Sequence, residues 1–245
     1  GLHRDTVCEL ILHVGDNCQR LLDSKVRNVA TEDFQLDEIW SFVGCKEKTR
    51  ITRGYGEELG DSWTFIGIDR NTKLVLAHRV GQRDHATCHA FLQQLGRATT
   101  GRFQLSTDGL NSYTLNVPFV LGNRVDFAQL IKNYQGQQEV TRYSPAKIIS
   151  AERRPVFGNP EWSQICTSHV ERFNLTVRMT VRRFTRLTNA HSKSPKHHVA
   201  MQSLFFAFYN FVRVHSTIKT TPAVAAGLAD KAWTIRELLE RAAES

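Results

Sequence analysis

The sequence has 245 residues, of which 41% are hydrophobic, which is enough for one sizeable buried core with an appendage. Its formal charge of +8 and its pI near 9.4 indicate a polyanionic partner. The sequence has no apolar run of about 18 residues and does not begin with the basic and then apolar segments of a signal peptide. We therefore expect a protein that is neither exported nor bound to a membrane.

The positive charge is concentrated in one part of the chain. From Arg142 to Lys219 there are 13 Lys and Arg against three acids, so the rest of the sequence is slightly acidic. We expect the C-terminal third to carry a basic surface. The five cysteines show no zinc-finger spacing, which predicts reduced and mostly buried thiols of a cytosolic protein. They are Cys8, Cys18, Cys45, Cys88 and Cys166.

The first half of the chain predicts one helix followed by alternating strands and helices. Helical periodicity covers the first 30 residues, with an interruption at Gly15 and Asp16. Three antiparallel strands are expected next, and Asp84 can cap the helix that follows them. The predicted strands of the sheet are 34–43, 63–69, 74–80, 103–107 and 124–131. The order βββαβαβα indicates an α/β fold with a mixed five-stranded sheet flanked by helices.

The second half begins with a break in the pattern. Glycines, prolines and cationic side chains between 132 and 160 predict an irregular basic insertion that orders on a partner. Helical periodicity returns at 168–187 and 197–214, and a short helix is expected at 234–243.

Three acidic residues stand in positions that suit metal-dependent chemistry. Asp37 lies inside the first predicted strand, Asp108 follows the fourth, and Glu171 lies near the start of the helix at 168–187. Two metal ions that clamp the attacking and leaving oxygens of a phosphodiester need a few converging carboxylates. Three competing acids are placed outside this site. They are Asp33, Glu38 and Asp69.

Each of the three acids also has a structural interpretation. Ser168 and Glu171 have the spacing of a capping box, and Asp108 before Gly109 suits an ordinary turn. Asp37 is harder to explain in this way. An unpaired carboxylate inside an apolar strand costs roughly several kcal/mol unless a cation compensates its charge.

The helix at 168–187 has two functional faces. Its apolar stripe should pack on the sheet and consists of Val170, Phe173, Val177, Val181 and Phe184. A second face carries Glu171, Arg178 and Arg182, so a carboxylate is followed by two guanidinium groups. Such a face could bind a metal ion at one end and phosphates below it.

Two other groups of side chains favour structural or solvated roles. The aromatic run at 205–209 could stack on bases, but helical spacing favours the core. His191, His197 and His198 stand beside lysines and favour a solvated, phosphate-facing segment over metal binding.

The acidic segments together resemble the DDE transposases of bacterial insertion sequences, most closely the insertion-sequence-one type. The matching segments are 36–43 (LDEIWSFV), 107–109 (TDG) with Tyr113, 171–178 (ERFNLTVR), and 209–215 (YNFVRVH) with 221–223 (TPA). The resemblance spans roughly residues 34–226 and is specific as a set.

This resemblance implies a ribonuclease-H-like catalytic fold with Asp37, Asp108 and Glu171 as catalytic residues and metal ligands. It implies two Mg²⁺ or Mn²⁺ ions, cleavage at element ends and transfer of the 3′ hydroxyl into target DNA. Arg178 matches the basic position seven residues after the acid, and we assign it to the DNA backbone. The other expected DNA contacts are Arg172, Arg182, Arg183, Lys193 and Lys196.

The resemblance also implies partners and a domain division. We expect double-stranded DNA as partner, a homo-oligomer on that DNA, and a cytoplasmic, nucleoid-associated location in a prokaryote. Residues 1–30 resemble the last helix of a helix-turn-helix DNA reader, so its front half is expected to be missing. Residues 31–190 would form the catalytic domain and 191–245 a helical extension. The rival functions are a non-catalytic DNA-binding remnant and a stand-alone metal-dependent nuclease.

Overall fold

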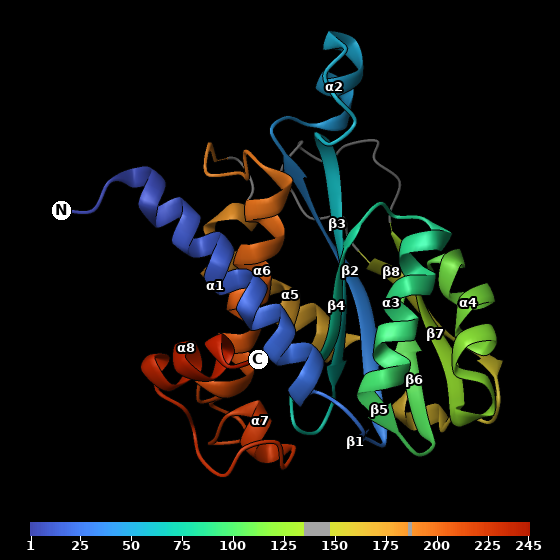
Figure 1. Cartoon of the computed structure of the whole chain (residues 1–245). Helices are drawn as coiled ribbons and strands as arrows, with labels where there is room; N and C mark the ends of the chain where they lie inside the picture. Colours follow the sequence, from blue (N-terminus) through green and yellow to red (C-terminus); the bar gives the residue numbers. More distant parts are fainter. Residues whose placement is uncertain (135–147, 186–187) are drawn as a thin grey trace.

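The computed structural model describes residues 1–134, 148–185 and 188–245. The fold is mixed α/β, with a six-stranded mixed sheet between two layers of helices (Figure 1). The strand order across the sheet is β4-β3-β2-β6-β7-β8. The strands are β2 (Asp33–Val43), β3 (Gly60–Asp69), β4 (Val75–Gly81), β6 (Phe103–Thr107), β7 (Val125–Tyr134) and β8 (Ile148–Phe157).

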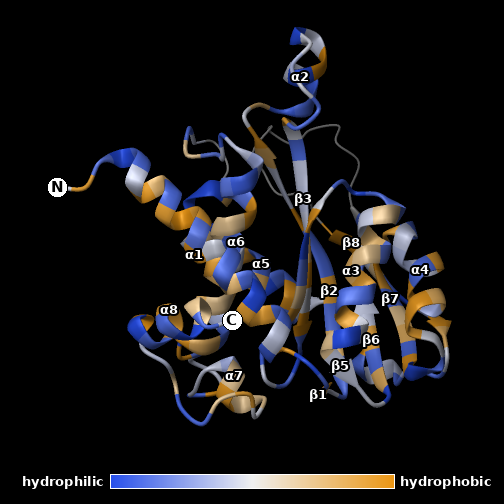
Figure 2. Ribbon diagram, viewed as in Figure 1, coloured by the Kyte–Doolittle hydropathy of each residue, from blue (hydrophilic) through white to orange (hydrophobic). Residues whose placement is uncertain are grey.

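Helices cover both faces of the sheet. Helices α5 and α6 lie against one face, with α1 packed on α6, and α3 and α4 lie against the other (Figure 1). In Figure 2, α3 and α4 alternate between apolar and polar colours, as expected of helices with one buried side. The long helices are α1 (Arg4–Lys25), α3 (His85–Ala98), α4 (Asn111–Leu121), α5 (Ser168–Thr180) and α6 (Pro195–Phe211).

Smaller elements complete the fold. Helix α2 projects from the end of the β2–β3 pair, while α7 and α8 lie beside α1 and α6 (Figure 1). Two short strands, β1 and β5, form a separate parallel pair. These elements are α2 (Glu47–Arg53), α7 (Pro222–Ala225), α8 (Ile235–Ala243), β1 (Val29–Ala30) and β5 (Thr99–Thr100).

The predicted antiparallel half of the sheet is confirmed. Strand β2 pairs antiparallel with β3 after the connection that contains α2, and β3 pairs antiparallel with β4 because a tight turn at residues 70–73 reverses the chain. Asp69 holds that turn: its carboxylate accepts hydrogen bonds from the backbone N–H groups of Asn71 and Thr72. Lys73 adopts a positive φ of 64° there. The turn chemistry was thus visible in the sequence.

The sheet has six strands where the sequence predicted five. Strand β8 pairs antiparallel with β7, so residues 148–157 are regular although they fall inside the predicted irregular insertion. The pattern of apolar residues did not predict this strand because most side chains of β8 are exposed. Strand β8 lies at the edge of the sheet, where Pro155 is tolerated. The part of the predicted insertion at 135–147 lies outside the described residues.

Helix α5 presents the predicted apolar stripe to the sheet. Val170, Phe173 and Val177 are all buried, as are Val181 and Phe184 just beyond the helix. The helix is shorter than predicted: it ends at Thr180 and a 3₁₀ turn covers 182–184. Residues 186–187, at the predicted end of the helix, lie outside the described residues.

The predicted core assignment of the aromatic run on α6 is confirmed. Phe205, Phe206 and Tyr209 are buried. The solvated role expected for His198 is wrong, because its ring is buried between the hydroxyls of Ser41 and Ser192. Its partners come from β2 and from the segment before α6, and the local sequence around His198 does not reveal them.

The five cysteines are free, but fewer are buried than predicted. Cys18 and Cys88 are buried, and the other three are only partly covered. Among the helices that the structure describes, none has the length and apolar composition needed to span a bilayer.

Helix α1 is continuous, so the predicted interruption at Gly15 and Asp16 is wrong. Gly15 serves a close contact between two helices instead. A Cβ atom at this position would lie 2.5 Å from the Cβ atom of Ala200 on α6. That distance is shorter than packed atoms tolerate, so the glycine allows the two helices to approach each other.

Gly15→Ala is therefore expected to destabilise the protein, although alanine is the better helix former by about 1 kcal/mol. Overpacking against Ala200 should lower the free energy of unfolding by about 1–3 kcal/mol. Chemical denaturation measures this change, with Asp16→Ala on the exposed side of α1 as control. Equal or greater stability of Gly15→Ala would show that the helices separate at little cost.

Candidate functional site

The three acids predicted as catalytic border one pocket of about 560 Å³. Asp37 comes from β2, Asp108 follows β6, and Glu171 lies in the first turn of α5. The pocket also includes two cations, Arg83 from the segment after β4 and Lys132 from β7. Three separate elements thus bring carboxylates to one concave surface.

The strand register explains why Asp37 and Asp108 meet. Strands β2 and β6 are parallel, and their last paired residues are Leu36 and Thr107. The next residue of each strand is Asp37 on one side and Asp108 on the other, so the two carboxylates start from the same level. Strand β2 continues past this point while β6 ends, which leaves the acids at an open strand end.

Glu38 lies close to this pair, although the sequence placed it outside the site. Carboxylate oxygens of Asp37, Glu38 and Asp108 all lie within 4.8 Å of one another. Asp37 and Glu38 point to opposite faces of β2, but β6 ends at Thr107 and no longer separates those faces at this level. The adjacent acids in the sequence were the signal, and the end of a neighbouring strand made both of them usable.

Crowding and burial disfavour negative charge on the two β2 acids. Burial, followed by the carboxylates of Glu38 and Asp108, raises the pKa of Asp37 to about 8, and Glu171 adds to the effect. Burial and the neighbouring Asp108 raise the pKa of Glu38 to about 7, against the opposing influence of the Tyr113 hydroxyl and of Arg83. Oε1 of Glu38 is buried without a hydrogen-bond partner among the described residues.

These features fit a divalent cation. Carboxylate oxygens are the ligands that Mg²⁺ and Mn²⁺ prefer, and a cation would offset the burial and the repulsion that raise both pKa values. The buried Oε1 of Glu38 is an available ligand atom.

Arg83 partly compensates the charge of the three acids. Its Nε donates to Oε2 of Glu38 at 3.1 Å, and its Nη2 lies 3.5 Å from Oδ2 of Asp108. The guanidinium carbon lies 4.9 Å from the ring centroid of Trp63. This cation–π contact helps to hold the guanidinium group in position. Arg83 follows β4 in the chain, and sequence reasoning did not select it.

Glu171 is held on the other side of the pocket. Its Oε1 accepts a hydrogen bond from Oγ1 of Thr167 at 2.5 Å and forms an ion pair with Lys132 on β7. The alternative capping box at Ser168 is absent, because Thr167 is the N-cap residue and Ser168 is the first helical residue. The Glu171 carboxylate therefore faces the pocket and does not cap its own helix.

Asn174 connects the helix to the strand. Its Nδ2 donates to Oδ2 of Asp37 at 2.8 Å, and Oδ1 of Asp37 accepts from the backbone N–H of Glu38 at 2.9 Å. Asn174 lies three residues after Glu171, close to one helical turn along the same side of α5. This amide fixes the orientation of Asp37 relative to Glu171.

Asp108 has the predicted turn interaction, and its second carboxylate oxygen faces the pocket. Its Oδ1 accepts from the backbone N–H of Leu110 at 2.9 Å, which is the interaction expected of a turn residue. Its Oδ2 is directed toward Arg83 and the other acids. The turn thus orients the carboxylate for the pocket.

The predicted DNA-contacting residues occupy different environments. Arg178 is part-buried and donates to the backbone carbonyls of Trp40 and Phe184, which fastens the end of α5 to β2. Arg182 follows the end of α5 and does not continue the helical face of Glu171 and Arg178, so that prediction is wrong. Arg183 donates to Ser192 at 3.4 Å. The exposed cations of the set are Arg172, Arg182, Lys193 and Lys196.

The raised pKa values predict an unusual dependence of stability on pH. Asp37 and Glu38 have higher pKa values when folded than when unfolded, so the folded state holds their protons more strongly. Without divalent metal, this contribution to stability should fall as pH rises above the ordinary values of 3.8 and 4.5 and be fully lost once pH passes about 7 to 8. Thermal melts at pH 6 and pH 9 test this, and added Mn²⁺ should stabilise most at the higher pH. An equal effect of Mn²⁺ at both pH values would contradict the expectation.

Comparisons with known proteins give little further information. No model of a known protein family matches the chain, and no curated protein matches it. Among solved structures it is similar to piggyBac transposase in a synaptic complex with hairpin DNA, with a TM-score of 0.31 and 10% identity. That alignment covers 87% of this chain and 52% of the other, so the chain spans about half the length of that transposase. The structural likeness is weak and distant.

Proposed function

We propose that the chain is the catalytic part of a DNA transposase that cuts phosphodiester bonds and joins a 3′ hydroxyl to target DNA. The observation that carries this proposal is the convergence of Asp37, Asp108 and Glu171 on one pocket. Asp37 and Asp108 extend adjacent parallel strands, and Glu171 reaches the same pocket from a helix.

The order of elements supports a ribonuclease-H-like catalytic domain. In the main sheet, Asp37 lies on the first strand in chain order, Asp108 follows the fourth, and Glu171 lies on a later helix. This is the arrangement that the resemblance to DDE transposases implies. We retain residues 31–190 as the proposed catalytic domain, 1–30 as part of a DNA-reading unit and 191–245 as an extension.

We propose that Asp37, Asp108 and Glu171 hold two Mg²⁺ or Mn²⁺ ions, with Glu38 as an additional ligand. Bound there, the ions would activate the attacking oxygen and stabilise the leaving oxygen of an in-line displacement.

The chain's own residues prepare the reaction in three ways. Asn174 orients the Asp37 carboxylate, and the turn at Leu110 orients that of Asp108. Lys132 reaches Glu171 from β7 and is positioned to neutralise a scissile phosphate that enters the pocket. The exposed cations after α5 then guide the flanking DNA backbone toward the acids.

The proposed partners follow from this chemistry. The substrate is double-stranded DNA, both as element end and as target, and the protein works with DNA in the prokaryotic cytoplasm. Joining two ends requires at least two active sites, so we propose a homo-oligomer that assembles on DNA.

A strand-transfer assay tests the proposal. Pre-cut duplex ends taken from the DNA flanking the gene are incubated with a supercoiled plasmid in Mn²⁺, Mg²⁺ or a chelator. We expect joined products with either metal and none with the chelator. Cleavage without joining would replace the transposase by a metal-dependent nuclease. Salt-sensitive binding without cleavage or joining would identify a DNA-binding remnant.

A further inference from the structure

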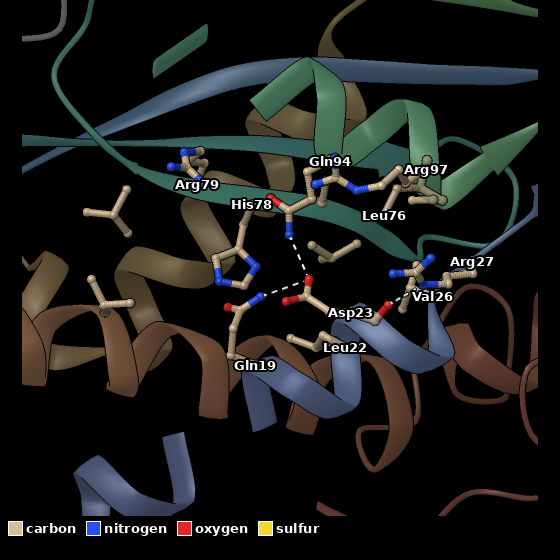
Figure 3. Close-up of a pocket in the computed structure, with 15 residues that line it drawn as sticks. Gln19, Leu22, Asp23, Val26, Arg27, Leu76, His78, Arg79, Gln94 and Arg97 are labelled. Carbon is tan, nitrogen blue, oxygen red and sulfur yellow. Dashed lines mark hydrogen bonds between the residues drawn. The ribbon is translucent and has the colours of Figure 1, made fainter. Parts of the chain in front are cut away.

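A second cavity, of about 470 Å³, lies between α1, α3 and the outer strand β4 (Figure 3). Six consecutive residues of β4, 75–80, border it. Because side chains of consecutive strand residues alternate between two faces, a cavity bordered by all six runs along the edge of the strand. Its length along the strand is about 17 Å. It shares no lining residue with the acid pocket.

The edge of β4 is unpaired along most of this cavity. Strand β4 is the last strand of the sheet, so its outer side has no neighbouring strand among the described residues. Among the described residues, only the backbone of Val75 has hydrogen-bond partners on this side. The Asn210 side chain accepts from its N–H at 3.0 Å and donates to its carbonyl at 2.9 Å. No other described residue bonds to the outer backbone from Leu76 to Val80.

The unpaired backbone is largely covered. Leu76, Ala77 and His78 are buried, with at most 6% of each residue exposed. Buried backbone donors and acceptors in native proteins are almost always partnered. An unpaired strand edge inside a cavity is therefore suited to receive another extended chain.

Charges at the two ends of the cavity indicate what kind of chain fits. Arg79 lies at one end, and Arg27 and Arg97 lie at the other (Figure 3). None of the three forms an ion pair with a described residue. Between the ends, the wall formed by Leu22 and Val26 is apolar and buried.

The cavity already shows how a carboxylate is bound there. Asp23 is the only acid among its lining residues, and its Oδ1 accepts from the amides of Gln19 and Gln94, each at 3.1 Å. Both amides point at Asp23, that of Gln19 from one turn earlier on α1 and that of Gln94 from α3 (Figure 3). An incoming carboxylate could replace Asp23 at these donors, since only one hydrogen bond joins α1 to α3 at this point.

We propose that the edge of β4 binds an extended segment of a partner protein, apolar in its centre and acidic at its ends, as an added strand. The strand edge offers alternating backbone donors and acceptors, which match another peptide backbone. A phosphodiester chain offers only acceptors and would leave the carbonyls of β4 unpaired. The arginines at both ends select carboxylates on the partner segment.

A blocked, fluorescent peptide of about eight residues tests the proposal, with Glu at both ends and alternating Val and Thr between them. The same peptide with Lys in place of Glu is the matched control. Fluorescence anisotropy should show the acidic peptide binding at least tenfold more tightly than the Lys peptide. The double variant Arg79→Glu, Arg97→Glu should reverse that preference, and Asp23→Asn should strengthen binding of the acidic peptide.

Hydrogen exchange identifies where the peptide binds. Binding of the acidic peptide should slow exchange of the backbone amides between Leu76 and Val80, and the thermal melts of the variants should match the parent because Arg79 and Arg97 are exposed. Equal affinity for both peptides, or unchanged exchange on β4, would overturn the proposal. So would displacement of the peptide by a single-stranded oligonucleotide, or self-association that protects β4 without peptide.

Discussion

Asp108→Asn should abolish strand joining, with a loss of activity of at least about 10²- to 10³-fold, the scale on which removal of a key electrostatic contact reduces catalysis. The change keeps the size of the side chain and the acceptor for the Leu110 backbone N–H, so the turn should survive. It removes a charge from the point where Asp37, Glu38 and Asp108 meet. The strand-transfer assay in Mn²⁺ measures the loss.

Two further variants make this result specific. Asp230→Asn replaces an exposed aspartate outside the pocket and should leave joining unchanged. Glu38→Gln tests the additional ligand: it should weaken Mn²⁺ binding while the fold and the Asp37–Asn174 hydrogen bond remain. If Asp108→Asn still joined DNA at the parent rate, the acid cluster would not be the catalytic site.

Arg83→Gln should increase the affinity for Mn²⁺ by about tenfold, which corresponds to about 1.4 kcal/mol. In the metal-free protein the guanidinium group of Arg83 neutralises Glu38 and Asp108 and so competes with a metal ion for the same oxygens. Removing it leaves the nearly buried Glu38 carboxylate uncompensated and favours any other cation. Isothermal titration with Mn²⁺ measures the change directly, without depending on activity.

The matched control is Arg79→Gln. Arg79 is an exposed arginine on β4, the strand just before Arg83, and it forms no ion pair among the described residues. Its Mn²⁺ affinity should equal that of the parent. The Arg83 variant should also be less stable than the parent without metal and recover when Mn²⁺ is added. Unchanged or weaker Mn²⁺ binding in Arg83→Gln would show that Arg83 supports the metal site and does not compete for it.

Local pattern in the sequence determined most of the elements. The period of apolar residues located α5 and the stripe from Val170 to Phe184, because a helix buries one side whatever it packs against. Turn and cap residues such as Asp84 located the boundaries between strands and helices, since their side chains bond to backbone only a few residues away. The three acids could likewise be selected, Asp37 as a carboxylate inside an apolar strand and Asp108 and Glu171 from their positions at a strand end and a helix start.

Only the tertiary structure decided how the site is composed. Glu38 enters it because β6 ends one residue short of Asp108 and opens both faces of β2. Arg83 and Lys132 reach the acids from segments 45 and 39 residues away in the chain. Such contacts depend on which strands become neighbours, and that choice is made by packing across the whole sheet.

The same division holds for the rest of the fold. The sequence around Gly15 suggested a break in the helix. In the structure α1 is continuous, and Gly15 is the point where it contacts Ala200 on α6. Strand β8 has little apolar alternation and becomes a strand because β7 offers it a free edge. By itself, the sequence determined most of the elements and three of the acids, because these rest on interactions between nearby residues. The register that brings the acids together, and the cations that balance them, rest on distant residues and required the folded chain.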